Sequence, residues 1–200
     1  MNTVIPRYEF RAFAQNFGLV EDRIRRLSRC ESYRESREIY VLSVGNDENN
    51  TKIRDDKMDI KVIVKKQQGL EQWAPRMKGE FPMAVETIRD EVCPALGVAF
   101  PPFERSRYTL EQFQHEIIRP HSDLSAAQVF KRRFGFTVNG CITEIADLLV
   151  NGAAIRTVAV ESEDSEAVLR VKEMLGLTEY DNVNYLLAIK RIIGMEPIPA

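Results

Sequence analysis

The chain has 200 residues, of which 44% are hydrophobic and 29% charged, and its formal net charge is −2. These values are typical of a globular protein with a sizeable core, and they argue against a general nucleic-acid-binding protein, which usually carries a basic surplus. The three cysteines include no CxxC pair, so neither a zinc site nor a disulfide framework is indicated. No apolar run reaches the roughly 18 residues of a membrane span, and no secretory signal opens the chain. We therefore expect a cytoplasmic protein without nucleic-acid or membrane partners.

The first third of the chain is rich in strand-forming segments. Val, Ile and Tyr recur in them, and clusters of Asp, Asn and Gly separate them. The predicted elements are, in chain order, a strand at 8–13, a helix capped by Asn16, a strand at 38–44, and a hairpin of 51–54 and 58–65.

The middle of the chain, residues 69–127, is predicted to be a helical insert. Residues 69–81 follow neither a strand nor a helix pattern and indicate an irregular connection. Pro82 suits the first position of a helix, and Thr109 with Gln112 resembles a capping box that opens a second helix.

The last third returns to strands and ends in helices. Asn139-Gly140 and Asn151-Gly152 are the strongest turn signals in the chain, and each predicts a hairpin. The predicted elements are strands at 129–138, 141–150 and 153–161, then C-terminal helices at 164–175 and 183–193. Two antiparallel strand groups, at 5–66 and 128–162, predict an α+β fold in which one domain over residues 1–200 forms a closed antiparallel β-barrel with flanking helices.

Charged residues recur at every second position of the predicted strands. Successive side chains of a strand point to opposite faces, so such charges share one face, and apolar residues fill the other. We expect the apolar face to pack against covering elements and the charged face to line a cavity suited to a polyanion and a metal ion. The alternating sets are Arg7, Glu9 and Arg11; Lys52 and Arg54; Asp59, Lys61 and Lys65; Lys131 and Arg133; and Glu161 and Glu163.

The order of these segments resembles the CYTH family of triphosphate tunnel metalloenzymes, whose proteins form an antiparallel eight-stranded tunnel. The family's first strand reads Glu-x-Glu-x-Lys, and residues 7–11 (RYEFR) stand in its place. Glu9 fills the second acidic position and Arg11 the basic one, whereas Arg7 replaces the first acid. The resemblance covers residues 5–66 and 128–192.

The resemblance also implies which residues form the site. Cations would bind the phosphate chain, carboxylates would hold Mg²⁺ or Mn²⁺, and no catalytic residue is assigned. Glu144 and Asp147 both fall on the strand where the family carries acids. The implied phosphate-binding residues are Arg11, Lys52, Arg54, Lys61, Lys131 and Arg133, and the implied metal ligands are Glu9, Glu161, Glu163 and Glu144.

The implied function is metal-dependent hydrolysis of a triphosphate compound, which could be inorganic triphosphate, a nucleoside triphosphate or thiamine triphosphate. Adenylate cyclase activity is also compatible with the resemblance. The alternative is a non-catalytic domain that binds polyphosphate or a phosphorylated ligand, because Arg7 adds a cation for the ligand but weakens the metal site. A plainer interpretation places the strand charges in water and Glu161 and Glu163 near the start of a helix. The sequence does not indicate an oligomeric state.

Overall fold

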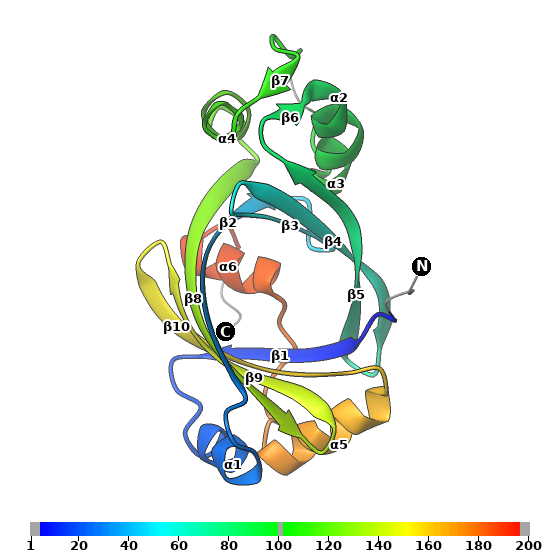
Figure 1. Cartoon of the computed structure of the whole chain (residues 1–200), viewed down its shortest axis with the longest axis vertical. Helices are drawn as coiled ribbons and strands as arrows, with labels where there is room; N and C mark the ends of the chain where they lie inside the picture. Colours follow the sequence, from blue (N-terminus) through cyan, green and yellow to red (C-terminus); the bar gives the residue numbers. More distant parts are fainter. Residues whose placement is uncertain (1–4, 100–101, 197–200) are drawn as a thin grey trace. The chain divides into compact units, whose positions relative to one another are not determined.

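Eight strands form a closed antiparallel barrel in the computed structural model, which describes residues 5–99 and 102–196 (Figure 1). Their order around the barrel is β1-β10-β9-β8-β2-β3-β4-β5. The predicted barrel with flanking helices is therefore confirmed. The strands are β1 (Tyr8–Ala14), β2 (Ser32–Ser43), β3 (Asn49–Arg54), β4 (Lys57–Gln67), β5 (Leu70–Glu80), β8 (Leu124–Val138), β9 (Cys141–Val150) and β10 (Ala153–Ser162).

The chain divides into two compact units, and β2, β4, β5 and β8 each run from one unit into the other. A single domain over the whole chain stays a prediction. Unit 1 comprises Met1–Ser36, Ile63–Ala74 and Phe130–Asn184, and unit 2 comprises Arg37–Val62, Pro75–Val129 and Tyr185–Ala200.

In unit 1 the apolar face of the sheet packs against helices α1 (Leu19–Leu27) and α5 (Ser165–Leu175), which lie close to each other beside β9 in Figure 1. Phe10 of β1 is fully buried there because each strand turns every second side chain toward the helices. The other core residues include Ala12, Val20, Ile24, Ile145, Val158, Val160, Val168, Val171 and Leu175. The expectation that one strand face packs against covering elements is confirmed for this unit.

In unit 2 the apolar faces of β2, β3 and β4 pack against a group of short helical and extended segments between residues 83 and 118. Buried members of this core include Val41, Ile53, Ile60, Ile88, Val92 and Phe113. The segments are β6 (Met83–Ala84), α2 (Val85–Thr87), the π-helical turn η1 (Ile88–Val92), α3 (Cys93–Leu96), β7 (Arg107–Tyr108), α4 (Leu110–Gln112) and the π-helical turn η2 (Phe113–Ile118), with α6 (Tyr185–Ile193) closing the chain.

The two-residue turns are as predicted. Asn139 and Gly140 have φ of 46° and 79°, and Asn151 and Gly152 have 47° and 91°, as two-residue hairpin turns require. The capping box of Thr109 and Gln112 is also confirmed, since both of its hydrogen bonds are present.

Three local predictions are wrong. Residues 69–81 are not irregular, because Leu70–Glu80 form β5, which pairs with β1; sheet pairing overrides the weak strand character that Pro75 and Gly79 give this segment. The predicted insert therefore begins with a barrel strand. Asn16 does not cap α1; its Oδ1 accepts a hydrogen bond from the Gly18 N–H at 2.6 Å, and the helix starts after Gly18.

The helix predicted to start at Pro82 starts at Val85 instead. Met83 and Ala84 pair with Tyr108 and Arg107 in the two-stranded β6–β7 sheet, so their backbone is extended. A helical segment nevertheless follows, and its Ile88 and Val92 are buried.

Gly176 ends α5 with φ of 77°, and a Cβ atom at this position would collide with Nη1 of Arg23. The same Nη1 donates to the Leu175 carbonyl at 2.9 Å, so the cap joins α1 to α5. We expect Gly176→Ala to lower the free energy of unfolding by about 1–2 kcal/mol, from backbone strain and the displaced guanidinium. Urea denaturation measures this loss.

Gly140→Ala is the matched control, because φ is 79° there and no atom lies within 4 Å of the added Cβ. Gly140→Ala should therefore lower the free energy of unfolding less than Gly176→Ala does. In an Arg23→Ala background the two glycine variants should differ less, because the guanidinium that the added Cβ displaces is absent. Equal losses in the two glycine variants would contradict the role of Arg23.

Candidate functional site

The charged face of the unit 1 strands carries four glutamates, which we call the acidic cluster: Glu9 on β1, Glu71 on β5, Glu144 on β9 and Glu161 on β10. Glu9 lies directly opposite Glu161 in the β1–β10 pair and opposite Glu71 in the β1–β5 pair. Opposed residues of neighbouring strands share a face, and like charges there repel. The cluster therefore needs counter-charges.

Arg7, just before β1, and Arg11 of β1 supply the counter-charges. Arg11 is only 5% exposed; its Nε donates to Glu9 Oε1 at 2.5 Å, and its Nη1 lies 3.3 Å from Glu144 Oε1. Arg7 Nη1 lies 3.3 Å from Glu161 Oε2. The fourth carboxylate, Glu71, accepts a hydrogen bond from Asn184 Nδ2 at 3.2 Å. Each carboxylate of the acidic cluster thus has a partner within unit 1.

Two glutamates of the acidic cluster have a raised pKa. Burial raises the pKa of Glu161, and the neighbouring Glu9 raises it further, while Arg11 and Arg7 act in the opposite direction. Burial also raises the pKa of Glu71, against the hydrogen bond from Asn184. Burial thus makes Glu161 and Glu71 harder to ionise than an exposed glutamate.

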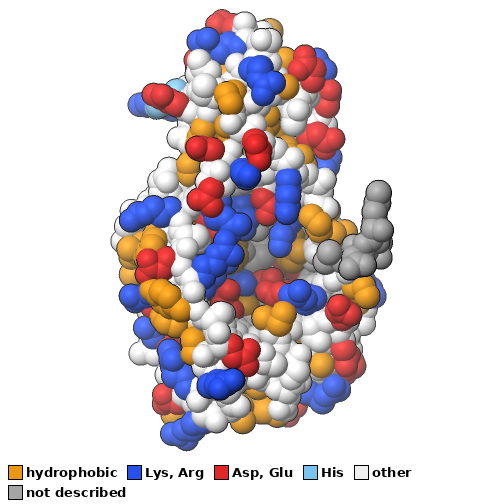
Figure 2. All heavy atoms as spheres, viewed as in Figure 1, with side chains coloured by type: hydrophobic (Ala, Val, Ile, Leu, Met, Phe, Trp, Pro, Cys, Tyr) orange, Lys and Arg blue, Asp and Glu red, His pale blue; other side chains and the backbone are white. Residues whose placement is uncertain are grey.

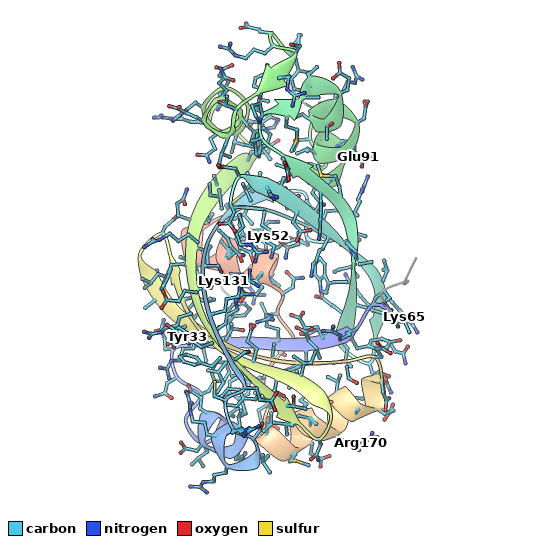
Figure 3. All side chains as sticks on the ribbon, viewed as in Figure 1. Tyr33, Lys52, Lys65, Glu91, Lys131 and Arg170 are labelled. Atoms are coloured by element: carbon cyan, nitrogen blue, oxygen red, sulfur yellow. The ribbon has the colours of Figure 1, made fainter. Side chains whose placement is uncertain are left out.

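The charged face of the unit 2 strands carries a second group, which we call the cationic cluster: Lys52 and Arg54 on β3, Lys61 and Asp59 on β4, and Glu38 on β2. Lys52 lies opposite Asp59 in the β3–β4 pair and opposite Tyr40 in the β2–β3 pair. Glu38, two residues before Tyr40, is fully buried and shares that face. Figure 3 labels Lys52 on its strand.

Lys52 and Arg54 share the buried carboxylate of Glu38. Lys52 Nζ lies 3.7 Å from Glu38 Oε2, and Arg54 Nη1 lies 3.6 Å from Oε1. Both distances exceed that of a hydrogen bond. Within the described part of the chain, neither side chain makes a hydrogen bond to any residue, although their side chains are only 17% and 33% exposed. Two half-buried cations therefore keep N–H donors that a ligand could use.

A cleft in unit 2 opens onto these donors. Its volume is about 410 Å³, within the range of small-molecule sites. Lys57 and Glu80 form an ion pair of 2.8 Å in its wall, and both are exposed. Figure 2 shows basic and acidic side chains intermixed on the visible face. The lining residues are Lys52, Arg54, Asp55, Lys57, Met58, Asp59, Lys78, Gly79 and Glu80.

The other predicted cations lie on β8 of unit 1. Lys131, labelled in Figure 3, is 2% exposed, and Arg133 Nη2 donates to Ser36 Oγ at 3.1 Å. Arg132 between them points to the opposite face, where its Nη2 binds Asp147 at 2.8 Å. Asp147 therefore lies on the other face from Glu144, three residues earlier on β9.

Glu163 is not brought to the acidic cluster. β10 ends at Ser162, and Glu163 lies exposed in the turn before α5. Asp164 caps that helix by accepting a hydrogen bond from the Glu166 N–H at 2.9 Å. Glu163 thus occupies the helix-start position of the plainer interpretation, whereas Glu161 belongs to the acidic cluster.

Sequence reasoning missed three charged residues. Glu71 was overlooked because its segment was expected to be irregular, and Glu38 because a single buried acid gives no alternating pattern. Lys190 of α6 is fully buried, with Nζ 2.6 Å from Asp47 Oδ1 and 3.3 Å from Glu196 Oε1. A lone lysine in an apolar helix carries no signal of such a pairing.

The residues as placed do not fit a metal ion. In residues 5–99 and 102–196, no group of three or more His, Cys, Asp or Glu side chains is arranged to hold one. Arginine guanidinium groups engage Glu9, Glu144 and Glu161, the oxygens that Mg²⁺ or Mn²⁺ would need. A requirement for Mg²⁺ or Mn²⁺ stays a prediction.

Comparisons with solved structures place the fold. A conserved hypothetical protein from Pyrococcus furiosus matches with a TM-score of 0.50 at 17% identity, over 90% of this chain and 98% of that one. The putative adenylyl cyclase HpAC1 from Hippeastrum, which has a dominant triphosphatase activity, matches with 0.51 at 12% identity, over 96% and 98%. A putative adenylate cyclase from Bacillus halodurans matches with 0.51 at 10% identity, over 89% and 94%.

The sequence comparisons give no match: neither a protein-family model nor a curated protein matches the chain. As to membranes, none of the helices within the described residues has the length and apolar character needed to span a bilayer. The likeness to solved structures therefore supports the fold and nothing beyond it.

The raised pKa of Glu161 makes a prediction about stability. Below the unfolded-state pKa of about 4.5, Glu161 is protonated in both states; above it, the unfolded chain ionises first, so ionisation disfavours the fold. We expect Glu161→Gln to melt higher than the wild type at pH 7, because glutamine removes the cost of holding a charge at this buried position.

Thermal melts between pH 4 and pH 8 measure this difference, with the exposed Glu163→Gln as control. The gap between Glu161→Gln and the wild type should widen as pH rises. A variant that melts lower than the wild type at every pH would show that the ion pair with Arg7 outweighs the burial of the charge.

Proposed function

The chain has a CYTH-type fold, and on this premise we propose that it binds a compound with a triphosphate or longer phosphate chain. The observation that carries the proposal is the pair Lys52 and Arg54. They are half-buried cations in a cleft, and their side chains make no hydrogen bond within the described residues. Phosphate oxygens would supply the missing acceptors.

The chemistry of these groups suits phosphate. A guanidinium presents five N–H donors in a planar fork that matches phosphate oxygens, and lysine adds a compact charge. Lys52 and Arg54 have ion-pair partners, but none within hydrogen-bond distance, so an anionic ligand that accepts their N–H groups would stabilise both. Lys61 lies opposite Asn50 in the β3–β4 pair, and Asn50 is two residues from Lys52, so Lys61 and Lys52 are on the same face of the sheet. Besides burial, the charge of Lys61 lowers the pKa of Lys52.

The six predicted phosphate-binding residues are not equally supported. Arg11 is held by Glu9 and Glu144, and Arg133 donates to Ser36, so ligand binding would compete with these contacts. The proposal therefore rests on Lys52, Arg54 and Lys61. Arg11, Lys131 and Arg133 remain predicted contributors.

A second candidate function is hydrolysis of the same compound. It is favoured by the fold likeness to HpAC1, which has a dominant triphosphatase activity. Inorganic triphosphate, a nucleoside triphosphate and thiamine triphosphate are the candidate substrates. Phosphate release and cyclic nucleotide formation, each measured with and without Mg²⁺ or Mn²⁺, separate hydrolase, cyclase and binding protein. If the chain binds these compounds but forms no product from any of them, the hydrolase and cyclase functions are excluded and only binding stands.

Arg54→Ala should weaken binding of tripolyphosphate by about 1.5–3 kcal/mol, roughly tenfold to a hundredfold, since it removes charge-assisted hydrogen bonds. Calorimetric titration measures the loss. The control is Arg119→Ala, an exposed arginine of the same unit, which should change the affinity less than about twofold. Equal effects of the two substitutions would place Arg54 outside the site.

Burial lowers the pKa of Lys52 below its ordinary 10.5, although Glu38 and Asp59 oppose this. Lys52 thus loses its proton at a lower pH than a free lysine. We expect tripolyphosphate affinity to fall as pH rises toward 10.5, and Lys52→Arg to move this fall to higher pH, because arginine keeps its charge. Identical affinity profiles between pH 7 and pH 10.5 would exclude Lys52 from the binding site.

A further inference from the structure

We infer that Arg7 and Arg11 neutralise the acidic cluster in place of a metal ion, so that the chain binds its phosphate ligand without a divalent cation. The first half, that Arg7 and Arg11 neutralise the acidic cluster, concerns unit 1 alone and does not depend on a ligand. The second half rests on the proposed function.

Arg11 is fixed in the acidic cluster. Its guanidinium is nearly inaccessible, bridges Glu9 and Glu144 across the sheet, and places Nη1 3.4 Å from Thr157 Oγ1. The backbone of Arg11 is also held, since its N–H donates to Asn182 Oδ1 at 2.8 Å and its carbonyl accepts from the Val183 N–H at the same distance.

A metal ion bound by Glu9 and Glu144 would displace this guanidinium. Arginine cannot release its proton, so the displaced group would remain as a buried cation beside a second cation. Removing one partner of a buried ion pair is strongly destabilising, because it leaves an uncompensated buried charge. Arg11 therefore opposes a metal ion at these two carboxylates.

Arg7 opposes a metal ion at the third carboxylate. It lies two residues before Glu9, just ahead of β1, and its Nη1 is 3.3 Å from Glu161 Oε2. Its side chain is 43% exposed, so the ion pair is weaker than those of Arg11. Replacing Arg7 is thus the smallest change that frees a carboxylate, and an acid at this position adds a second one next to it.

The first test uses Mn²⁺ alone, titrated by electron paramagnetic resonance against the full chain. The wild type should bind Mn²⁺ weakly. Arg7→Glu should bind it more tightly by about tenfold or more, because affinity for hard cations rises with the number of carboxylate ligands. Arg7→Gln, which frees Glu161 without adding an acid, should lie between the two.

The matched control is Arg29→Glu, which makes the same charge change at an exposed arginine of unit 1 and should leave Mn²⁺ affinity within about twofold of the wild type. If the wild type, Arg7→Glu and Arg7→Gln all bind Mn²⁺ with equal affinity, the inference that the arginines take the place of a metal ion is overturned. If Arg7→Glu fails to fold, the comparison of Arg7→Gln with the wild type decides the same question.

The second test is calorimetric titration of the wild type with tripolyphosphate, in a chelator and then in Mg²⁺. Affinity in the chelator within about threefold of that in Mg²⁺ supports the second half, since the protein would supply the cations itself. Binding seen only with Mg²⁺ overturns it. Absence of binding in both buffers refutes the proposed function, and the Mn²⁺ result for the acidic cluster still stands.

Discussion

The alternation of side chains along antiparallel strands is the constraint on which the rest of the structure depends. A strand that turns Phe10 into the helix-covered core of unit 1 must turn Glu9 and Arg11 to the other face. The same holds in unit 2, where Ile53 is buried and Lys52 and Arg54 share the charged face. Charged side chains on these faces are therefore a consequence of the same register that builds the two cores.

Charge pairing then distinguishes the two faces. In unit 1 each carboxylate of the acidic cluster has a guanidinium or amide partner, and Arg11 is bound on two sides. In unit 2 one buried carboxylate, Glu38, faces two cations at distances too long for hydrogen bonds. The first face is largely satisfied from within, whereas the second keeps donors for an anion. This difference makes phosphate binding a better supported function than metal-dependent chemistry.

Much of this arrangement could be predicted from the sequence, because period-two patterns and Asn-Gly turns are local signals. They gave the three C-terminal strands, and Cys141–Val150 to the residue. Spacing alone also separates Asp147 from Glu144, since positions three apart on a strand face opposite ways. The pairing of Arg7 with Glu161 joins residues 154 positions apart, so it depends on the β1–β10 register that no local pattern contains.

The segment Leu70–Glu80 shows the other limit of local reasoning. Pro75 and Gly79 weaken its strand character, and its pairing with β1 becomes visible only in the barrel. Glu71 was lost from the predicted site with it. Glu163 was included because it continues an alternation beyond the point where β10 ends, and only the turn into α5 shows that the strand has stopped.

A crystal structure of the chain with tripolyphosphate, grown in a chelator, would show whether Lys52 and Arg54 bind phosphate without a metal ion. Phosphate oxygens should lie within hydrogen-bond distance of Lys52 and Arg54, with Arg11 still bound to Glu9 and Glu144. Phosphate bound only to residues of the opposite strand face, such as Arg132, would contradict it. A metal ion in the acidic cluster of wild-type crystals grown without the chelator would also contradict it.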